Sequence, residues 1–313
     1  MESTQTGGIV APWRTRPVAG ARLDLKTLRM ATHGWRLGAA VVYKPGARDL
    51  SAIACELASA GVASGALIVD DAPAGGSTAR DARPEHVEHP TAVRTLLIVR
   101  DAPPRPQLGM AAATAVAEVV ENALGRPCAV AWPWDVGLRT GGADGTLARL
   151  CRISVEVDTA RDVAYVGLRF ALARIWSARR VARAAGEAPG APLFSNENWR
   201  EIMLARALHA LDVRMSALVT ALPAESAERA ALAREWRRRV VAPRRVVIAG
   251  ADGGRATGCG LGIAPDGALL VRPALCSDDA APRRFTLDDV VQAWGVGWRA
   301  ARADGQADGQ SAE

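Results

Sequence analysis

The sequence predicts an α+β protein in which a mixed sheet carries helices on one face and is followed by a helical pair and a small β-barrel. Three observations support this prediction. Short apolar runs typical of strands alternate with helical patterns between residues 39 and 176. A long amphipathic pattern follows from about residue 195 to residue 240, and the segment after Pro243 is β in character throughout.

The first elements are predicted from strand runs and helix caps. Residues 1–20 are polar and rich in Pro and Gly, so we expect them to be disordered. AAVVYKP predicts a strand that ends at Pro45, and Asp49 predicts the N-cap of a helix that stops at Gly61. GALIVDD and RTLLIVRD predict two more strands. The long loop 72–91 between them is of a length that indicates a functional or disordered segment.

A second helix and further strands complete a first domain over residues 21–176. The helix LGMAAATAVAEVVENALG ends at Gly125, and CAVAW predicts a strand followed by a turn. After a Gly-rich turn, LARLCRISVEV and DVAYVGLRFALARI predict two strands. The apolar positions that predict the helix are Met110, Ala113, Val116, Val120 and Leu124.

The second predicted unit, residues 177–242, consists of a linker over 177–194 and a helical pair. Ser195 opens the first helix, Pro223 stops it, and the second helix covers about 224–240. The apolar stripe of the first helix is typical of a core or helix–helix interface and comprises Trp199, Ile202, Met203, Leu208, Leu211, Met215, Leu218 and Leu222.

The third predicted unit, residues 243–298, is a small C-terminal β-barrel of the SH3-like kind. Pro265-Asp266-Gly267 between two apolar runs is a strong hairpin signal. The tail over 299–313 is polar and of low complexity, so we expect it to be disordered.

Composition excludes several classes of function. The 313 residues carry a net charge of +6, almost all from arginine, but no nucleic-acid-binding motif accompanies it, so we expect no nucleic-acid partner. A membrane span needs about 18 consecutive apolar residues, and no apolar run in the sequence comes near that length. The N-terminus lacks a signal-peptide pattern. We therefore expect a cytoplasmic protein without a membrane partner.

The sequence predicts no metal centre and no common nucleotide-binding loop. Five widely spaced cysteines without a CxxC pair indicate reduced thiols. His86-Val87-Glu88-His89 lacks zinc spacing and a third ligand, so it indicates a surface loop. Neither a P-loop, a GxSxG motif nor a GxGxxG run after a strand is present.

One motif and its surroundings carry a resemblance to a known family. Trp132-Pro133-Trp134-Asp135 ends a strand, and a Gly-rich turn, a strand containing Val155-Glu156 and the strand YVGLRF follow it. This order resembles the catalytic domain of biotin protein ligases, in the biotin/lipoate A/B protein ligase superfamily, which carry WPND, KLAG and GxGIN motifs. GLGIAPDGALLV is similar to the hairpin of the C-terminal barrel of these ligases.

The resemblance implies a ligase reaction in two steps. The carboxylate of a small acid, such as biotin or lipoate, attacks ATP to form an acyl-adenylate, and the acyl group then passes to a lysine of a carrier protein. It therefore implies ATP and Mg²⁺ as cofactors if the protein is active, and otherwise none. In the family a GRGR-type loop covers the adenylate, and the KLAG lysine meets the carboxylate and the phosphate.

This sequence departs from the family at each of those points. Compared with the family, its predicted active site is therefore degenerate. The KLAG position reads Gly145-Thr146-Leu147-Ala148, and Lys26 and Lys44, the only lysines, lie far upstream. Trp134 replaces the Asn of WPND, and Arg169 falls near the GxGIN asparagine. The loop candidates are Gly75, Gly76, Arg80 and Arg83, which form no GRGR.

Two hypotheses remain for the function. In the first, a divergent ligase-like protein binds a carboxylic acid or its acyl-adenylate, and transfers it to a carrier lysine if it is an active ligase or acyltransferase. In the second, a non-catalytic binding or scaffolding protein keeps the ligase fold. The ligand-binding candidates are Trp132, Asp135, Arg149, Arg152, Gly167 and Arg169.

Arginine could replace the missing lysine in the first hypothesis. Arg149 and Arg152 are three apart on a strand, so they are predicted to lie on opposite faces, with one of them toward the ligand beside Arg169. Asp135 could then hold Mg²⁺ or a substrate amine. In the alternative interpretation, Asp135 caps a turn and the arginines are solvated.

Overall fold

The computed structural model describes most of the chain. The described residues are 22–47, 49–71, 92–139, 147–184, 186, 197–220, 227–243, 245–250, 255–273, 281–288 and 290–295. The predictions for residues 1–20, for the loop 72–91 with Gly75, Gly76, Arg80, Arg83 and the His86–His89 cluster, for Ser195 and Pro223, and for the tail over 299–313 fall outside these ranges.

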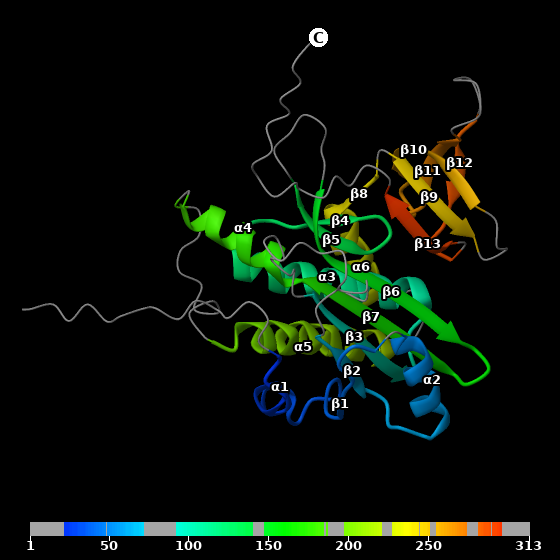
Figure 1. The fold of residues 1–313 in the computed structure, drawn as a ribbon. Coiled ribbons are helices and arrows are strands. Elements are labelled where there is room, and N and C mark those ends of the chain that lie inside the picture. Colours follow the sequence, from blue (N-terminus) through cyan, green and yellow to red (C-terminus); the bar gives the residue numbers. More distant parts are fainter. Residues whose placement is uncertain are drawn as a thin grey trace, which may run out of the picture.

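An eight-stranded mixed sheet forms the centre of the molecule, as Figure 1 shows. Its order is β1-β2-β3-β7-β6-β5-β4-β8. The pairs β1–β2 and β4–β8 are parallel and the other neighbours are antiparallel, which confirms the predicted mixed sheet. The strands are β1 (Val41–Tyr43), β2 (Leu67–Asp70), β3 (Ala92–Arg100), β4 (Ala129–Ala131), β5 (Asp135–Arg139), β6 (Leu147–Asp158), β7 (Val163–Ala171) and β8 (Val240–Val241).

Helices cover both faces of this sheet, not one face as predicted. On one face α3 and α5 pack over the main core, to which the strands contribute residues such as Leu97 and Val166. Alternate strand residues point the other way, where Ile68 and Tyr165 form a second core with Ala54 of α2. The helices are α1 (Leu25–Thr32), α2 (Leu50–Ser59), α3 (Arg105–Leu124), α4 (Leu172–Ala184), α5 (Trp199–Thr220) and α6 (Ala227–Arg239).

The predicted helix caps and the hairpin are confirmed. The Asp49 carboxylate accepts hydrogen bonds from the backbone N–H groups of Ser51 and Ala52, at 2.8 and 3.1 Å. Gly125 ends α3 in the left-handed conformation, with φ of 69°. In the C-terminal hairpin Gly267 has φ of 92°, and its N–H donates to the Ala264 carbonyl at 2.8 Å.

Five elements differ from the prediction. The strand predicted through Ile175 ends at Ala171, and the helix α4 replaces its last residues and the start of the predicted linker. Helix α1 was not predicted, although Asp24 caps it by accepting from the Lys26 N–H at 2.9 Å. Strands β5 and β8 were not predicted either. The start of β5 was predicted as part of the turn after β4, and β8 has only two residues and directly follows α6.

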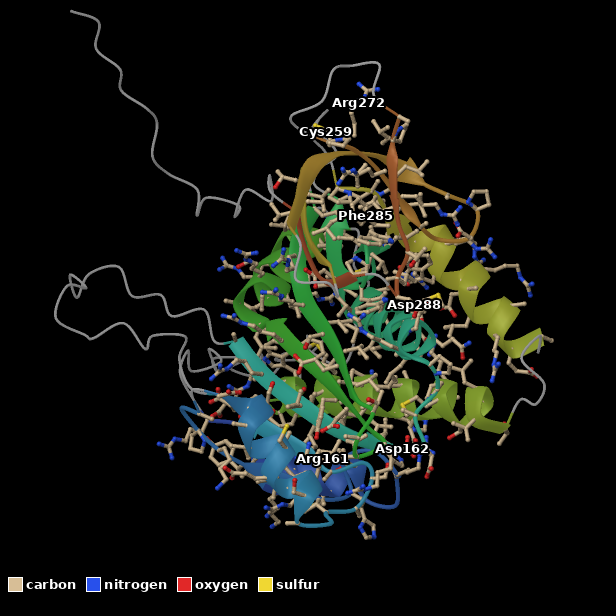
Figure 2. The ribbon with its side chains drawn as sticks, turned by 90° about the vertical axis from the view of Figure 1, so that its right-hand side faces the viewer. Arg161, Asp162, Cys259, Arg272, Phe285 and Asp288 are labelled. Atoms are coloured by element: carbon tan, nitrogen blue, oxygen red, sulfur yellow. The ribbon has the colours of Figure 1, made fainter. Side chains whose placement is uncertain are left out.

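The segment after Pro243 forms a second, five-stranded antiparallel sheet of order β12-β11-β10-β9-β13. Figure 2 shows Cys259, Arg272 and Phe285 of this sheet at the opposite end of the molecule from Arg161 and Asp162, in the turn between β6 and β7. Its closure as an SH3-like barrel stays a prediction. The strands are β9 (Arg245–Gly250), β10 (Arg255–Ile263), β11 (Leu269–Pro273), β12 (Arg283–Phe285) and β13 (Val290–Gly295).

Two indole groups join the central sheet to this C-terminal sheet. Trp132 Nε1 donates to the Gly267 carbonyl at 3.0 Å, and Trp236 Nε1 of α6 donates to the Pro133 carbonyl at 3.1 Å. Both Trp side chains are buried in the main core. The Trp-Pro-Trp turn is therefore a packing junction between the hairpin, α6 and the central sheet.

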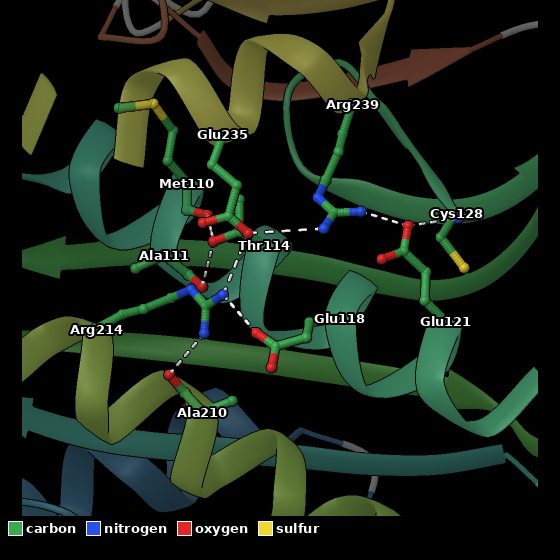
Figure 3. Close-up of polar contacts among 10 residues, drawn as sticks. All are labelled: Met110, Ala111, Thr114, Glu118, Glu121, Cys128, Ala210, Arg214, Glu235 and Arg239. Carbon is green, nitrogen blue, oxygen red and sulfur yellow. Dashed lines mark hydrogen bonds and ion pairs between the residues drawn. The ribbon is translucent and has the colours of Figure 1, made fainter. Parts of the chain in front are cut away.

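A network of ion pairs ties α5 and α6 to α3, as Figure 3 shows. Arg214 of α5 bridges Glu118 of α3 at 2.6 Å and Glu235 of α6 at 3.2 Å. Arg239 of α6 pairs with Glu121, whose carboxylate also accepts the backbone N–H of Cys128 at 2.8 Å. The helical pair is thus held to the core of the first predicted unit.

We predict that Trp132→Ala lowers the free energy of unfolding by about 3–5 kcal/mol, because the side chain is only 3% exposed and its removal leaves a cavity. Chemical denaturation of the wild type and the variant measures this change. Trp35→Ala is the comparison, since Trp35 is only partly buried and should cost less. Equal costs for the two variants would contradict the role given to the Trp132 junction.

Candidate functional site

An irregularity in β6 determines which side chains share a face. Val136 of β5 pairs with Cys151, whereas Gly137 pairs with Arg149, so Leu150 is an extra residue on β6. This bulge shifts the alternation by one residue. Arg149 and Arg152 therefore lie on the same face, and the prediction that they lie on opposite faces is wrong.

The packing around the bulge supports this placement. Before it, Leu147 packs with Ala129 and Ala131, away from the main core. After it, Cys151 and Ile153 point into the main core, so Arg152 between them points away from it. We call the side of the central sheet opposite α3 and α5 the open face.

Three arginines stand side by side on the open face. Arg94 of β3 pairs in register with Arg169 of β7, and Arg169 pairs with Arg152 of β6. Directly opposite residues have Cβ atoms about 4.5–5.5 Å apart, and like charges at that spacing are destabilising. We call Arg94, Arg169 and Arg152 the arginine row.

Among the described residues, carboxylates pair with these arginines only at the two ends of the arrangement. At one end Asp70, whose side chain is fully buried, pairs with Arg94 and accepts the Gly46 N–H at 2.9 Å. At the other end Asp135 Oδ2 lies 2.9 Å from Arg149 Nε, beside the arginine row. Among these six side chains, four arginines and two carboxylates leave two positive charges uncompensated.

The middle of the arginine row has no partner within the described part of the chain. The side chains of Arg152 and Arg169 form no hydrogen bond or ion pair there, although Arg152 acts on Asp135 at longer range. Arg169 is exposed and Arg152 is half-buried. Their guanidinium groups are available to an anion that approaches the open face.

Asp135 is held by the protein on both carboxylate oxygens. Oδ1 accepts the Ile153 N–H at 3.1 Å, and Oδ2 pairs with Arg149. Burial raises the pKa of Asp135, and the charge of Arg149 and the Ile153 N–H only partly offset this effect. Asp135 therefore fastens the start of β5 to β6 across the bulge.

The described residues show no ready-made metal site. They contain no group of three His, Cys, Asp or Glu side chains that could hold a metal. Both Asp135 oxygens are already engaged, so the hypothesis that this residue holds Mg²⁺ gains no support from its contacts. The arginine row, in contrast, fits phosphate or carboxylate oxygens.

The remaining candidates differ in their placement. Gly167 lies on the open face, where the Ser154 Oγ occupies the space that an added Cβ would take. Trp132 lies on the opposite side, in the main core. Gly75, Gly76, Arg80 and Arg83 lie outside the described residues.

Sequence reasoning missed Arg94 and Asp70. Each residue is visible in the sequence, at the start of RTLLIVRD and within GALIVDD. Only the register, which pairs Asp70 with Arg94 and Arg94 with Arg169, brings them to the same face as the predicted candidates.

A separate cavity of about 330 Å³ lies between α3, α6 and the C-terminal sheet. In Figure 2, Asp288 marks its position beside α3. It adjoins the main-core side of the central sheet, apart from the arginine row. Its lining residues are Pro106, Met110, Ala233, Trp236, Arg237, Pro265, Asp266, Ala268, Thr286, Leu287 and Asp288.

Two other predictions concern the thiols and the membrane. Cys55, Cys128, Cys151 and Cys259 are free cysteines, and burial raises the pKa of Cys128 to about 12.

Within the described ranges, every helix is too short or too polar to span a bilayer.

Comparisons with known proteins give matches in structure alone. No protein-family model matches the chain, and no curated protein matches it in sequence. Among solved structures, the biotin protein ligase from Aquifex aeolicus in complex with biotin and ATP matches with a TM-score of 0.47 and 14% identity. The match covers 82% of this chain and 99% of that chain.

Two further matches come from other organisms. The biotin protein ligase from Leishmania major in complex with biotin has a TM-score of 0.41 and 14% identity, over 79% of this chain and 98% of that chain. A biotin protein ligase-like protein of unknown function from Silicibacter sp. TM1040 has a TM-score of 0.39 and 19% identity, over 78% and 94%. All three are named as biotin protein ligases or as a biotin protein ligase-like protein, which is the group that the sequence resembles.

We predict that Asp135 makes the protein less stable as pH rises. Because the folded-state pKa of Asp135 is raised, the folded protein binds more protons than the unfolded chain above the ordinary value of about 3.9. The melting temperature of the wild type minus that of Asp135→Asn should therefore fall from acid pH upward and level off above the raised pKa.

Asp158→Asn is the matched control for this measurement. A hydrogen bond from the Arg161 side chain lowers the pKa of Asp158, so the corresponding difference should rise with pH. If the melting-temperature difference for Asp135 also rose with pH, folding would favour the ionised carboxylate. The conclusion that burial raises the pKa of Asp135 would then be wrong.

Proposed function

We propose that the open face binds a small carboxylic acid or its acyl-adenylate, as in a divergent protein of the biotin/lipoate ligase type. The observation that supports this is the pairing of Arg152 with Arg169, two like charges in register to which no described carboxylate is paired. Such a pair costs stability in the free protein. A bound anion would remove that cost and gain charge-assisted hydrogen bonds.

The proposed ligand suits guanidinium groups in particular. Arginine presents a planar fork that binds a carboxylate or phosphate through two hydrogen bonds. An acyl-adenylate carries a phosphate next to its acyl carbonyl, so adjacent arginines on neighbouring strands could contact both. Arg149 already pairs with Asp135, so Arg152 is the better replacement for the missing lysine.

The proposed reaction, if the protein is active, has two steps. A carboxylate oxygen attacks the α-phosphorus of ATP, and pyrophosphate leaves. The amine of a carrier lysine then attacks the acyl carbonyl, AMP leaves, and the amine loses a proton. Arginine stays protonated throughout, so Arg152 and Arg169 would contribute charge and positioning and no proton transfer.

The finer parts of the sequence predictions belong to this proposal. We propose that residues 21–176 form the ligase-like unit, that 177–242 form the linker and helical pair, and that 243–298 close as an SH3-like barrel. A carrier protein as acceptor and a cytoplasmic location are proposed on the same basis.

A non-catalytic binding or scaffolding protein is the second proposal. It is favoured by the absence of lysine from the KLAG position. ATP-dependent release of pyrophosphate with biotin, lipoate or octanoate separates the two. Release would support a ligase, and binding without release would support the second proposal.

We predict that a non-hydrolysable acyl-adenylate mimic of one of these acids raises the melting temperature. Biotin is tested first, because the Trp132–Asp135 motif resembles that of biotin protein ligases, two of which are named as complexes with biotin and ATP and with biotinyl-5-AMP. At about 100 times its dissociation constant, a ligand adds about 2.7 kcal/mol to stability. Thermal-shift measurements with each mimic test this.

The arginine variants make the test specific. Arg152→Met and Arg169→Met should each weaken binding about tenfold or more, since a hydrogen bond to a charged group contributes about 1.5–3 kcal/mol. Arg206→Met is the matched control, because Arg206 is exposed on α5, on the other side of the sheet. If neither variant weakened binding of the mimic, the ligand would bind outside the arginine row.

A further inference from the structure

Helix α4 exposes a basic side. Leu172, Ile175 and Ala182 are buried, at the spacing of one helical face. The opposite side, which is exposed, carries Arg174, Ser177, Arg180 and Val181 at three- and four-residue spacing. We call Arg174, Arg180 and Val181 the α4 exposed face.

No acidic side chain balances this charge within the helix. The sequence of α4, LARIWSARRVARA, contains several arginines but no Asp or Glu. In the described part of the chain, the side chain of Arg180 forms no hydrogen bond or ion pair, and that of Arg174 contacts only a backbone carbonyl. Among the described residues, the positive charge of the α4 exposed face is therefore not paired with a carboxylate.

The start of α4 lies close to the strands that carry the arginine row, although the helix packs against α3 and the main core on the other side of the sheet. Helix α4 begins directly after β7, the strand that carries Arg169, and Figure 1 shows it extending from that end of the sheet. Arg174 Nη1 donates to the backbone carbonyl of Arg149 at 3.3 Å. A partner bound at the start of α4 would thus be close to Arg149, which lies on the open face beside the arginine row.

We propose that the α4 exposed face docks an acidic surface of a partner protein. Charge complementarity defines the partner, and arginine is enriched at protein interfaces. Val181, which follows Arg180 and is 62% exposed, supplies an apolar contact. The proposal rests on the proposed function and extends it, because an acceptor protein bound here would lie beside the open face.

The same surface fits a nucleic acid or a membrane less well. The one aromatic residue of α4, Trp176, stacks on Trp199 with ring centroids 5.8 Å apart, so it is not free to stack on bases. A single exposed valine offers little apolar area for insertion into a bilayer. Both classes are nevertheless outcomes of the test below.

The test measures binding of a fluorescein-labelled Glu-rich peptide by fluorescence anisotropy, without acid or nucleotide. A peptide of about 20 residues suffices, since the 13 residues of α4 span about 20 Å. We expect binding that weakens between about 0.05 and 0.2 M salt. Arg174→Glu combined with Arg180→Glu should weaken it at least about tenfold.

Two further variants separate docking on α4 from other effects. Arg180→Glu alone leaves the contact between Arg174 and Arg149 in place, and should still weaken binding about threefold or more. Arg152→Met removes a charge of the arginine row and should change binding by less than about twofold. Weakening by Arg152→Met without weakening by Arg180→Glu would place the peptide on the open face and overturn the proposal.

Arg206→Glu combined with Arg238→Glu is the matched control, with the same change of charge at exposed positions of α5 and α6. Equal weakening by both double variants would overturn the proposal. So would tighter binding of a DNA duplex or of phosphatidylserine vesicles that depends on Arg174 and Arg180. The anisotropy assay contains no acid, nucleotide or acyl-adenylate mimic. A negative result would therefore not affect the thermal-shift test of the proposed function.

Discussion

The burial of α3 is the constraint on which the rest of the structure depends. Thirteen of its 20 residues are buried, among them small residues such as Ala112 and Gly109. A Cβ on Gly109 would overlap the Trp134 indole, so the helix needs glycine there to approach the Trp-Pro-Trp turn. The sheet, α5 and α6 all pack around α3, and apolar strand residues point toward it.

This arrangement leaves the charged strand residues on the open face. Helix α2 covers the part that contains Ile68 and Tyr165, and the arginine row occupies the neighbouring part. The bulge at Leu150 brings Arg149 and Asp135 to the same side. A protein that places like charges in register bears a cost in stability, which function would explain.

Local signals in the sequence predicted much of the fold but only part of the site. Caps and turns such as Asp49, Gly125 and Gly267 were predictable because each acts through neighbouring backbone atoms. The face of Arg149 was not, since a bulge depends on pairing with another strand. The ion pair between Asp70 and Arg94 likewise depends on register, which apolar patterns do not reveal.

The central claim is that Arg152 and Arg169 repel each other in the free protein. A double-mutant cycle with Arg152→Met and Arg169→Met, measured by thermal denaturation at low salt without ligand, tests it most directly. We predict that either single variant is at least as stable as the wild type, with a repulsive coupling of about 0.2–1 kcal/mol. Destabilisation by both single variants, without repulsive coupling, would mean that the arginines already have partners and would contradict the account.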